Sequence, residues 1–351
     1  MNLIKYIDGT YNSFLSKVFL FPLYIISLIY GLIIRIRFFF YSAGIFKTRQ
    51  LPCIVVSIGN ITVGGSGKTP MAIYLAGELA KKGKKVVVLS RGYKSKNKDI
   101  DIVSDGKNIL LNPDEAGDEP FLIAKKTKNI PVVIGMDRYK AGLFAIEKFH
   151  PDIIILDDGF QHIRLKRDKD IVLIDSIRGF GNGCLLPRGI LREPIDSFKR
   201  ADNIFVSNDK NEEIIHKIRA AGAAAPVKSF KYKPSGFVNL ADDTMIEPDK
   251  LKNKNILAFA GIANPISFFK TLEGLGIIIK GKMVFPDHHK YNIKDIEKIK
   301  TRANSIDCFI TTEKDGVKIK DLLSENIVIY ALLIDVEIYK EAEFIEWVCG
   351  C

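Results

Sequence analysis

The chain has 351 residues, of which 47% are hydrophobic and 26% are charged, with 52 Lys and Arg against 41 Asp and Glu. This composition is typical of globular domains and excludes collagen-like, disulfide-framework and wholly disordered proteins. The net charge of +11 favours acidic partners such as phosphorylated substrates or anionic headgroups. The five cysteines form no CxxC pair and no zinc-type spacing, which indicates a reducing compartment. The length predicts two domains.

The first 50 residues are both basic and apolar. They contain 17 consecutive uncharged residues at positions 18–34, followed by Arg35 and Arg37. Seventeen residues is the lower limit for a helix that spans a bilayer. The segment therefore predicts a membrane-attached helix, which either spans the bilayer or lies in its interface with the arginines at the headgroups. A buried core helix is the remaining alternative.

Beyond residue 50, short β-branched runs alternate with helical patterns. Strands are predicted at 54–58, 85–90, 130–135, 152–158, 170–175, 203–207, 255–261, 276–285, 307–312 and 326–332. Helices are predicted at 70–82, 120–128, 138–149, 211–222, 264–274 and 293–304. Apolar strands alternating with helices are typical of a parallel sheet covered on both faces, so we expect an α/β fold. A polar stretch at about 225–253 interrupts the pattern and predicts a domain boundary.

The most informative motif follows the first predicted strand and leads into a helix. It comprises Thr62, Val63, Gly64, Gly65, Ser66, Gly67, Lys68 and Thr69. The glycines let backbone N–H groups turn toward a phosphate, and the helix N-terminus adds its positive dipole end. Lys68 can reach the β- and γ-phosphates of a nucleotide, and the Thr69 hydroxyl can bind Mg²⁺. Thr62 replaces the first glycine of the usual pattern, but the strand–loop–helix context still predicts a P-loop; an ordinary glycine-rich turn is the alternative.

A second feature is an apolar strand that ends in Asp157 and Asp158. P-loop proteins place an acid next to Mg²⁺ in this way, although buried strands also end in acids for structural reasons. The next residues, GFQH, add a titratable imidazole at His162. This stretch is therefore a candidate metal site.

Several strings together resemble one known family. They are GNITVGGSGKTP (59–70), SRGY (90–93), GDEP (117–120), DDGFQH (157–162), LPRGILREP (186–194), FPDHHKY (285–291) and TTEKDGVK (311–318). In this order they are similar to the motifs of the tetraacyldisaccharide 4'-kinase family, the lipid A 4'-kinases. The resemblance implies transfer of the γ-phosphoryl group of ATP to the 4'-hydroxyl of tetraacyldisaccharide 1-phosphate, forming lipid IVA at the cytoplasmic face of the inner membrane.

The resemblance also implies an architecture and partners. Two α/β/α lobes with mostly parallel sheets are expected, joined by a small β-stranded hinge, with ATP in the P-loop NTPase-like N-terminal lobe. We assign 1–50 to the membrane-associated helix, 51–225 to the nucleotide-binding lobe, 226–254 to the hinge and 255–351 to the C-terminal lobe. The expected partners are the lipid A precursor and membrane lipids, and not nucleic acid.

Site residues follow from the same resemblance. Asp118 is implied as the catalytic base, paired with His288 or His289, of which we favour His289, because a carboxylate and an imidazole orient each other. Lys68 and Arg192 are expected to stabilise the transferring phosphoryl group. The implied Mg²⁺ ligands are Thr69, either Asp157 or Asp158, and Glu193. Arg91 and Tyr93 are expected to bind the nucleotide together with the loop residues 62–69.

Two alternatives come from other classes of P-loop protein. A GTPase switch needs an NKxD-type motif, which TEKD at 312–315 resembles only superficially. A transport-associated ATPase is disfavoured because the sequence has no LSGGQ-like signature.

Overall fold

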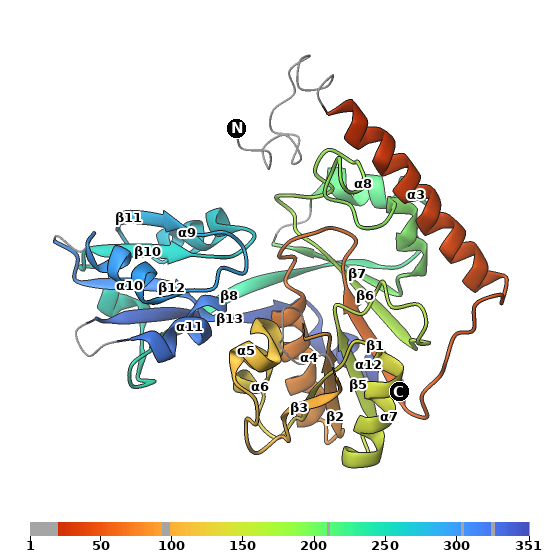
Figure 1. The fold of residues 1–351 in the computed structure, drawn as a ribbon, viewed down its shortest axis with the longest axis horizontal. Helices are drawn as coiled ribbons and strands as arrows, with labels where there is room; N and C mark the ends of the chain where they lie inside the picture. The colour runs from red at the N-terminus through yellow and green to blue at the C-terminus, as the bar shows by residue number, and fades with distance from the viewer. Residues whose placement is uncertain (1–19, 93–98, 209–210, 303–304, 324–326, 351) are drawn as a thin grey trace. The chain divides into compact units, whose positions relative to one another are not determined.

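The structure is a computed structural model that describes residues 20–92, 99–208, 211–302, 305–323 and 327–350 (Figure 1). The chain divides into two compact units. The first comprises Met1–Arg91, Gly135–Lys231 and Glu337–Cys351, and the second comprises Gly92–Ile134 and Tyr232–Val336. Each unit therefore combines segments that are distant in sequence. Residues 92–134, which the sequence analysis assigned to the nucleotide-binding lobe, pack with the second unit, and the assignment to lobes remains a prediction.

The first unit is built on a parallel sheet. Its strands are β1 (Ile54–Gly59), β2 (Val86–Ser90), β5 (Ile153–Asp157), β6 (Lys169–Ile174), β7 (Asn203–Ser207) and the start of β8 (Val227–Asn239). They run in the order β8-β7-β6-β1-β5-β2, and each neighbouring pair is parallel. The helices are α3 (Phe21–Ser42), α4 (Lys68–Lys81), α7 (Arg138–Phe149), α8 (Glu212–Ala220) and α12 (Glu341–Cys349), with the 3-10 helix η1 (Ile195–Arg200). The central strands are buried along almost their whole length, as expected for a sheet covered on both faces.

The second unit contains the remaining strands of the sheet. Strands β10 (Ile256–Ala260), β11 (Ile279–Val284), β12 (Cys308–Thr312) and β13 (Ile329–Ile338) are parallel, in the order β11-β10-β12-β13, and β8 follows β13. Strand β9 (Met245–Ile246) pairs antiparallel with β8. Strand β3 (Asp101–Ser104) pairs antiparallel with β4 (Val132–Ile134). The helices are α5 (Pro113–Ala116), α6 (Asp118–Lys126), α9 (Pro265–Gly274), α10 (Ile293–Lys300) and α11 (Glu313–Ile319), with η2 (Pro248–Leu251) and η3 (Lys320–Leu322). Helices α6 and α11 pack against each other.

The predicted α/β class with mostly parallel strands is confirmed, and each predicted strand and helix is present within a few residues of its expected bounds. No individual strand range was predicted within the polar stretch at about 225–253, but its first part forms β8, a strand of 13 residues, and the domain boundary there stays a prediction. Its side chains alternate between buried positions such as Phe230 and exposed ones, so charged residues fit one face. Pro234 and Gly236 within the strand obscured this pattern.

Helix α3 is the predicted apolar helix, drawn in red in Figure 1. Within it, only Ser27, Gly31 and Ile34 are buried. Its exposed apolar side chains are Phe21, Tyr24, Ile25, Ile26, Leu28, Ile29, Leu32, Ile33, Ile36 and Phe39. The helix is long and apolar enough to cross a membrane, with a mean hydropathy of 1.9 over its best window. Since most of its surface is exposed, the alternative of a buried core helix is wrong.

Candidate functional site

The predicted P-loop joins β1 to α4 in the first unit. Gly64 has a φ of 106° and Gly67 a φ of 86°, which are left-handed conformations that favour glycine. An internal hydrogen bond stabilises the loop, because the side-chain amide of Asn60 donates to the Ser66 hydroxyl at 2.8 Å. The loop also pairs with residues before Arg192, since the Val63 N–H donates to the Ile190 carbonyl at 2.8 Å.

Two cationic side chains converge on Asp158, directly after β5. Lys68 Nζ lies 3.7 Å from Asp158 Oδ1, and Arg192 donates to both Asp158 oxygens at 2.7 and 3.0 Å. Although burial favours the protonated form, Lys68 and Arg192 lower the pKa of Asp158 well below its usual range. Asp158 has a φ of 55°, which is uncommon outside glycine and is often found at functional sites. The predicted residues Lys68, Asp158 and Arg192 therefore form one charged cluster.

Asp157 lies one residue earlier and is 3% exposed. Its Oδ2 accepts a hydrogen bond from the Ser90 hydroxyl at 3.3 Å. The sequence analysis did not list Arg138 as a candidate, but this 4%-exposed side chain lies in the electrostatic field of Asp157 and Asp158. Burial lowers the pKa of Arg138 to about 10, which the two carboxylates partly oppose. Only the three-dimensional structure brings this arginine to the strand-end carboxylates.

Glu193 and the SRGY residues have different surroundings. The Glu193 carboxylate is 2% exposed and accepts a hydrogen bond from Arg200. Burial raises the pKa of Glu193 above its usual value despite the charge of Arg200. Arg91 follows β2, whose carboxyl end lies at the same sheet edge as those of β1 and β5 because these strands are parallel neighbours. Tyr93 lies outside the described residues.

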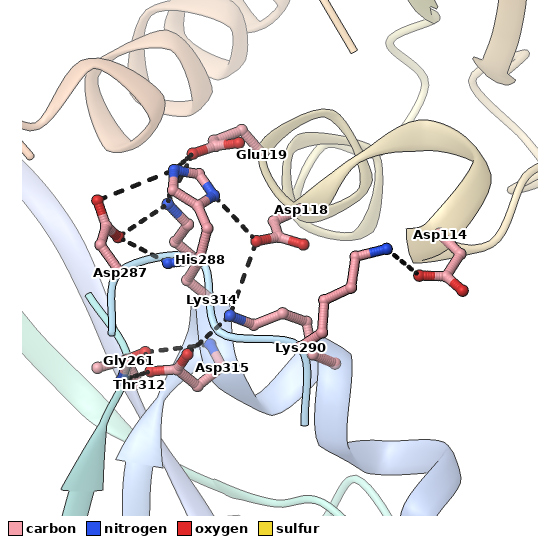
Figure 2. A network of polar contacts seen from close by, with 11 residues as sticks. Asp114, Asp118, Glu119, Gly261, Asp287, His288, Lys290, Thr312, Lys314 and Asp315 are labelled. Atoms are coloured by element: carbon pink, nitrogen blue, oxygen red, sulfur yellow. Dashed lines mark hydrogen bonds and ion pairs between the residues drawn. The ribbon is translucent and has the colours of Figure 1, made fainter. Parts of the chain in front are cut away.

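A second polar cluster lies in the second unit and surrounds Asp118 (Figure 2). Asp118 is the first residue of α6 and follows Gly117. Its Oδ2 is 3.2 Å from His288 Nδ1 and 3.7 Å from Lys318 Nζ. Burial by itself favours the protonated acid, but the His288 hydrogen bond and the charges of Lys318 and Lys314 outweigh it and lower the pKa of Asp118. Asp118 is therefore an ionised carboxylate at neutral pH.

The partner of Asp118 is His288, and the expectation that favoured His289 was wrong. His288 has a φ of 56°, so the chain turns sharply between the two histidines. His289 instead places its Nε2 at 3.0 Å from Asp295 Oδ2, and its ring stacks on Phe285 with centroids 4.9 Å apart. His289 therefore joins the loop to α10 and the apolar core of the second unit.

Three charged residues of this cluster, Lys314, Asp315 and Lys318, lie in the TTEKDGVK string, but the sequence analysis gave them no individual role. Lys314 Nζ lies 2.7 Å from Glu119 Oε1 and 3.2 Å from His288 Nε2, and Lys318 Nζ lies 2.9 Å from Asp315 Oδ1 (Figure 2). Asp315 is fully buried and accepts from the Gly261 N–H at 2.8 Å. The spacing of Lys314 and Lys318, four residues apart on one helix, was the available signal, because such residues share a face.

The side chains near the P-loop include oxygen donors of the kind that bind metal ions. Within the described ranges, no group of three or more His, Cys, Asp or Glu side chains is placed to hold an ion. Mg²⁺ usually takes one or two protein carboxylates, with the remaining positions filled by water and substrate phosphates. The Thr69 hydroxyl and the carboxylates of Asp157 and Asp158 are oxygen donors of this kind, so the residues present fit Mg²⁺.

The glycine-rich loop between a parallel strand and a helix, with its lysine beside a strand-end carboxylate, defines a P-loop nucleotide-binding protein. The family model described as tetraacyldisaccharide-1-P 4'-kinase matches residues 19–350. The chain belongs to this family.

Individual relatives agree with this membership. The tetraacyldisaccharide 4'-kinase of Desulfatibacillum aliphaticivorans is 42% identical over 336 residues, covering 91% of this chain and 89% of the relative. That of Halothermothrix orenii is 40% identical over 360 residues, covering 96% and 94%. A crystal structure of the "apo" form of LpxK from Aquifex aeolicus in complex with ATP has a TM-score of 0.75 and 36% identity, covering 95% of this chain and 98% of that one.

These findings establish the activity. The protein is an ATP-dependent lipid kinase that transfers the γ-phosphoryl group of ATP to the 4'-hydroxyl of the lipid A precursor tetraacyldisaccharide 1-phosphate, forming lipid IVA. The GTPase switch and the transport-associated ATPase are therefore set aside.

Proposed function

We propose that the two polar clusters perform different parts of this 4'-kinase reaction. The cluster of Lys68, Asp158 and Arg192 holds the phosphates of ATP, and the cluster of Asp118 and His288 removes the proton of the 4'-hydroxyl. The observation that carries the proposal is the convergence of Lys68 and Arg192 on Asp158 directly beyond a buried parallel strand. Ligands of open parallel sheets bind at this edge.

ATP is held by the P-loop backbone and two cations. The amides of residues 62–69 surround the phosphates, and the N-terminus of α4 adds a positive dipole end. Lys68 and Arg192 neutralise charge on the transferring group, and Asp158 orients both side chains before the reaction. Arg91 and Tyr93 are proposed to contact the nucleotide, since SRGY follows a neighbouring strand.

Mg²⁺ is proposed as the cofactor, held by the Thr69 hydroxyl and by Asp157 or Asp158. When bound, Mg²⁺ neutralises the negative charge on the β- and γ-phosphates. The two carboxylates stay alternatives, because Asp158 accepts two hydrogen bonds from Arg192 and Asp157 accepts one from Ser90. Glu193 can serve as a ligand only if its ion pair with Arg200 opens.

Asp118 is proposed to accept the proton of the attacking 4'-hydroxyl. A general base must be unprotonated, and the lowered pKa of Asp118 supports this state at neutral pH. A weak base suits phosphoryl transfer, in which proton removal can follow bond breaking in a loose transition state. His288 holds Asp118 Oδ2 and so orients the carboxylate.

The protein is proposed to lie at the cytoplasmic face of the inner membrane, with membrane lipids as partners. One side of α3 packs against the rest of the first unit. The Ser27 hydroxyl accepts from the Arg188 N–H at 2.9 Å, and the Arg37 guanidinium donates to the Gln161 carbonyl at 3.2 Å. A Cβ on Gly31 would lie 2.7 Å from Leu185 Cδ1. These contacts along the helix favour an interfacial helix over a spanning one, with its exposed apolar side chains in the lipid.

The division into lobes is also part of the proposal. Residues 51–225 form the nucleotide-binding lobe and 255–351 the C-terminal lobe, with 226–254 as the hinge. Limited proteolysis tests it: cleavage should concentrate in 240–254, the part of the hinge that follows strand β8, because a strand paired on both sides resists proteases.

The experiment that tests the proposed site is transfer of γ-labelled phosphate from ATP to tetraacyldisaccharide 1-phosphate by the purified full-length protein. Label should appear in the lipid only when Mg²⁺ is added, and it should be lost in Lys68→Ala and Asp118→Asn. Equal transfer in the presence of excess chelator would contradict the proposed cofactor, and full activity in either variant would contradict the assigned cluster.

A further inference from the structure

The imidazole of His288 lies between a carboxylate and an ammonium group (Figure 2). Its Nδ1 is 3.2 Å from Asp118 Oδ2, and its Nε2 is 3.2 Å from Lys314 Nζ. An ammonium group has three donors and no acceptor, so the nitrogen that faces it must accept. The single proton of a neutral imidazole then lies on Nδ1 and is donated to Asp118.

The groups around Nε2 compete to decide where the proton of the ring lies. Glu119 Oε1 lies 3.5 Å and Asp287 Oδ2 4.0 Å from Nε2, and both are acceptors, so alone they would favour a proton on Nε2. Lys314 opposes them. Its Nζ lies 2.7 Å from Glu119 Oε1 and 4.0 Å from Asp287 Oδ1, so it occupies these acceptors and presents only donors to Nε2.

We propose that Lys314 is a positioning residue that fixes the His288 tautomer with the proton on Nδ1. The inference rests on the proposed role of Asp118 as the base. In this tautomer His288 donates to Oδ2 of Asp118 and holds the carboxylate in one orientation, with Oδ1 left for the proton of the 4'-hydroxyl. With the proton on Nε2 instead, the ring would present a lone pair to Asp118, the two groups would repel, and the carboxylate would lose this orientation.

The surroundings keep Lys314 charged and in place. It lies on α11, which packs against α6, the helix that carries Asp118 and Glu119. Although burial favours the neutral amine, the charges of Glu119 and Asp287 raise the pKa of Lys314 above its ordinary value. Lys318, one turn later, lies between Asp118 and Asp315 and completes the set of charges around the pair.

The tautomer can be read directly in the full-length detergent-solubilised enzyme by ¹⁵N NMR of labelled histidine. The sequence has five histidines, and the His288 signals are those that disappear in His288→Gln. We expect a protonated Nδ1 and an unprotonated Nε2 in the wild-type enzyme. A proton on Nε2 in the wild-type enzyme would overturn the inference without any variant at position 314.

Variants then connect the tautomer to catalysis. In Lys314→Met the acceptors Glu119 and Asp287 remain, so the proton of His288 should move to Nε2, and kcat should fall about tenfold or more. Lys314→Arg keeps a donor and should preserve the tautomer. The matched control is Lys290→Met in the same unit, since Lys290 is 64% exposed and lies 3.5 Å from Asp114; its His288 tautomer and its kcat should match the wild type.

Two outcomes separate this inference from the proposed base. An unchanged His288 tautomer in Lys314→Met contradicts the inference even if Asp118 is the base. Full activity in Asp118→Asn contradicts the proposed base, whereas the NMR result still decides the tautomer. If Lys314→Met does not fold because Glu119 loses its partner, the double variant Lys314→Met/Glu119→Gln removes both charges and allows the same measurement.

Discussion

The hydroxyl of Tyr30, on the apolar helix α3, donates a hydrogen bond to the backbone carbonyl of Arg192 at 3.0 Å. The Arg192 side chain binds Asp158, which lies 3.7 Å from the P-loop lysine. The Arg192 N–H in turn donates to the carbonyl of Ile61 at 2.7 Å, just before the P-loop. The helix with the exposed apolar face is thus connected to the phosphate cluster by consecutive hydrogen bonds within one unit.

Removing the Tyr30 hydroxyl should therefore affect catalysis more than membrane binding. In Tyr30→Phe we expect kcat to fall about threefold to tenfold, which corresponds to one neutral hydrogen bond, with the same fraction of protein on vesicles. Steady-state kinetics and vesicle sedimentation provide the two readouts. Tyr24→Phe is the matched control, since Tyr24 is on the same helix and 43% exposed. Equal loss of kcat in both variants would show that the connection to Arg192 is not the cause.

A charged residue on the exposed face of α3 should weaken membrane binding more than it affects catalysis. Leu32 is 59% exposed, and Leu32→Glu should release protein from vesicles and raise the KM for bilayer-presented lipid, because a carboxylate is costly to bury in lipid. Activity on detergent-dispersed substrate should change little. The matched control is Ile266→Glu, at a position 64% exposed on α9. Vesicle binding by Leu32→Glu equal to that of the wild type would argue against the interfacial role.

Lys68→Ala should reduce turnover by about two orders of magnitude or more, because a charge developing on the γ-phosphate loses its partner. Lys82 offers a control at the opposite end of α4, where it follows the last residue of the helix and is exposed. Turnover by Lys82→Ala should equal that of the wild type in the label-transfer assay. Substantial activity in Lys68→Ala would mean that the loop is structural rather than a phosphate site.

The lowered pKa of Asp118 also predicts how stability depends on pH. A carboxylate whose pKa is depressed on folding stabilises the native state above its unfolded pKa of about 3.9, and this contribution is lost as the pH falls through the folded value. The difference in free energy of unfolding between wild type and Asp118→Asn should therefore be largest near neutral pH and shrink in acid. Urea unfolding at several pH values measures it. A difference that grows as the pH falls would have the wrong sign.

The sequence predicted the features that depend on local pattern. The P-loop is a contiguous string, and its glycines, Lys68 and Thr69 indicate the same turn and helix start that the structure has. The order of strands and helices followed from apolar runs of the right length. The exposed apolar surface of α3 also followed from an uncharged run, although the contacts of the helix with the rest of the first unit did not.

The sequence could not predict features that depend on single backbone angles or on contacts between residues distant in the chain. His288 and His289 are equivalent in sequence, and only the left-handed φ at His288 decides which ring faces Asp118. Lys314 is 195 residues from its partner Glu119, so no spacing rule relates them. No residue range was predicted for strand β8, although a β-stranded hinge was expected there, because its exposed side chains are charged and its interior contains a proline.

The central claim is that Asp118, oriented by His288, accepts the proton of the 4'-hydroxyl. The most direct measurement is single-turnover transfer from γ-labelled ATP by Asp118→Asn, with the Kd for ATP measured on the same preparation. The account predicts that transfer slows by about a hundredfold or more while the Kd stays close to that of the wild type, because a base acts in the transition state. Unchanged transfer with a weakened Kd for ATP would contradict it.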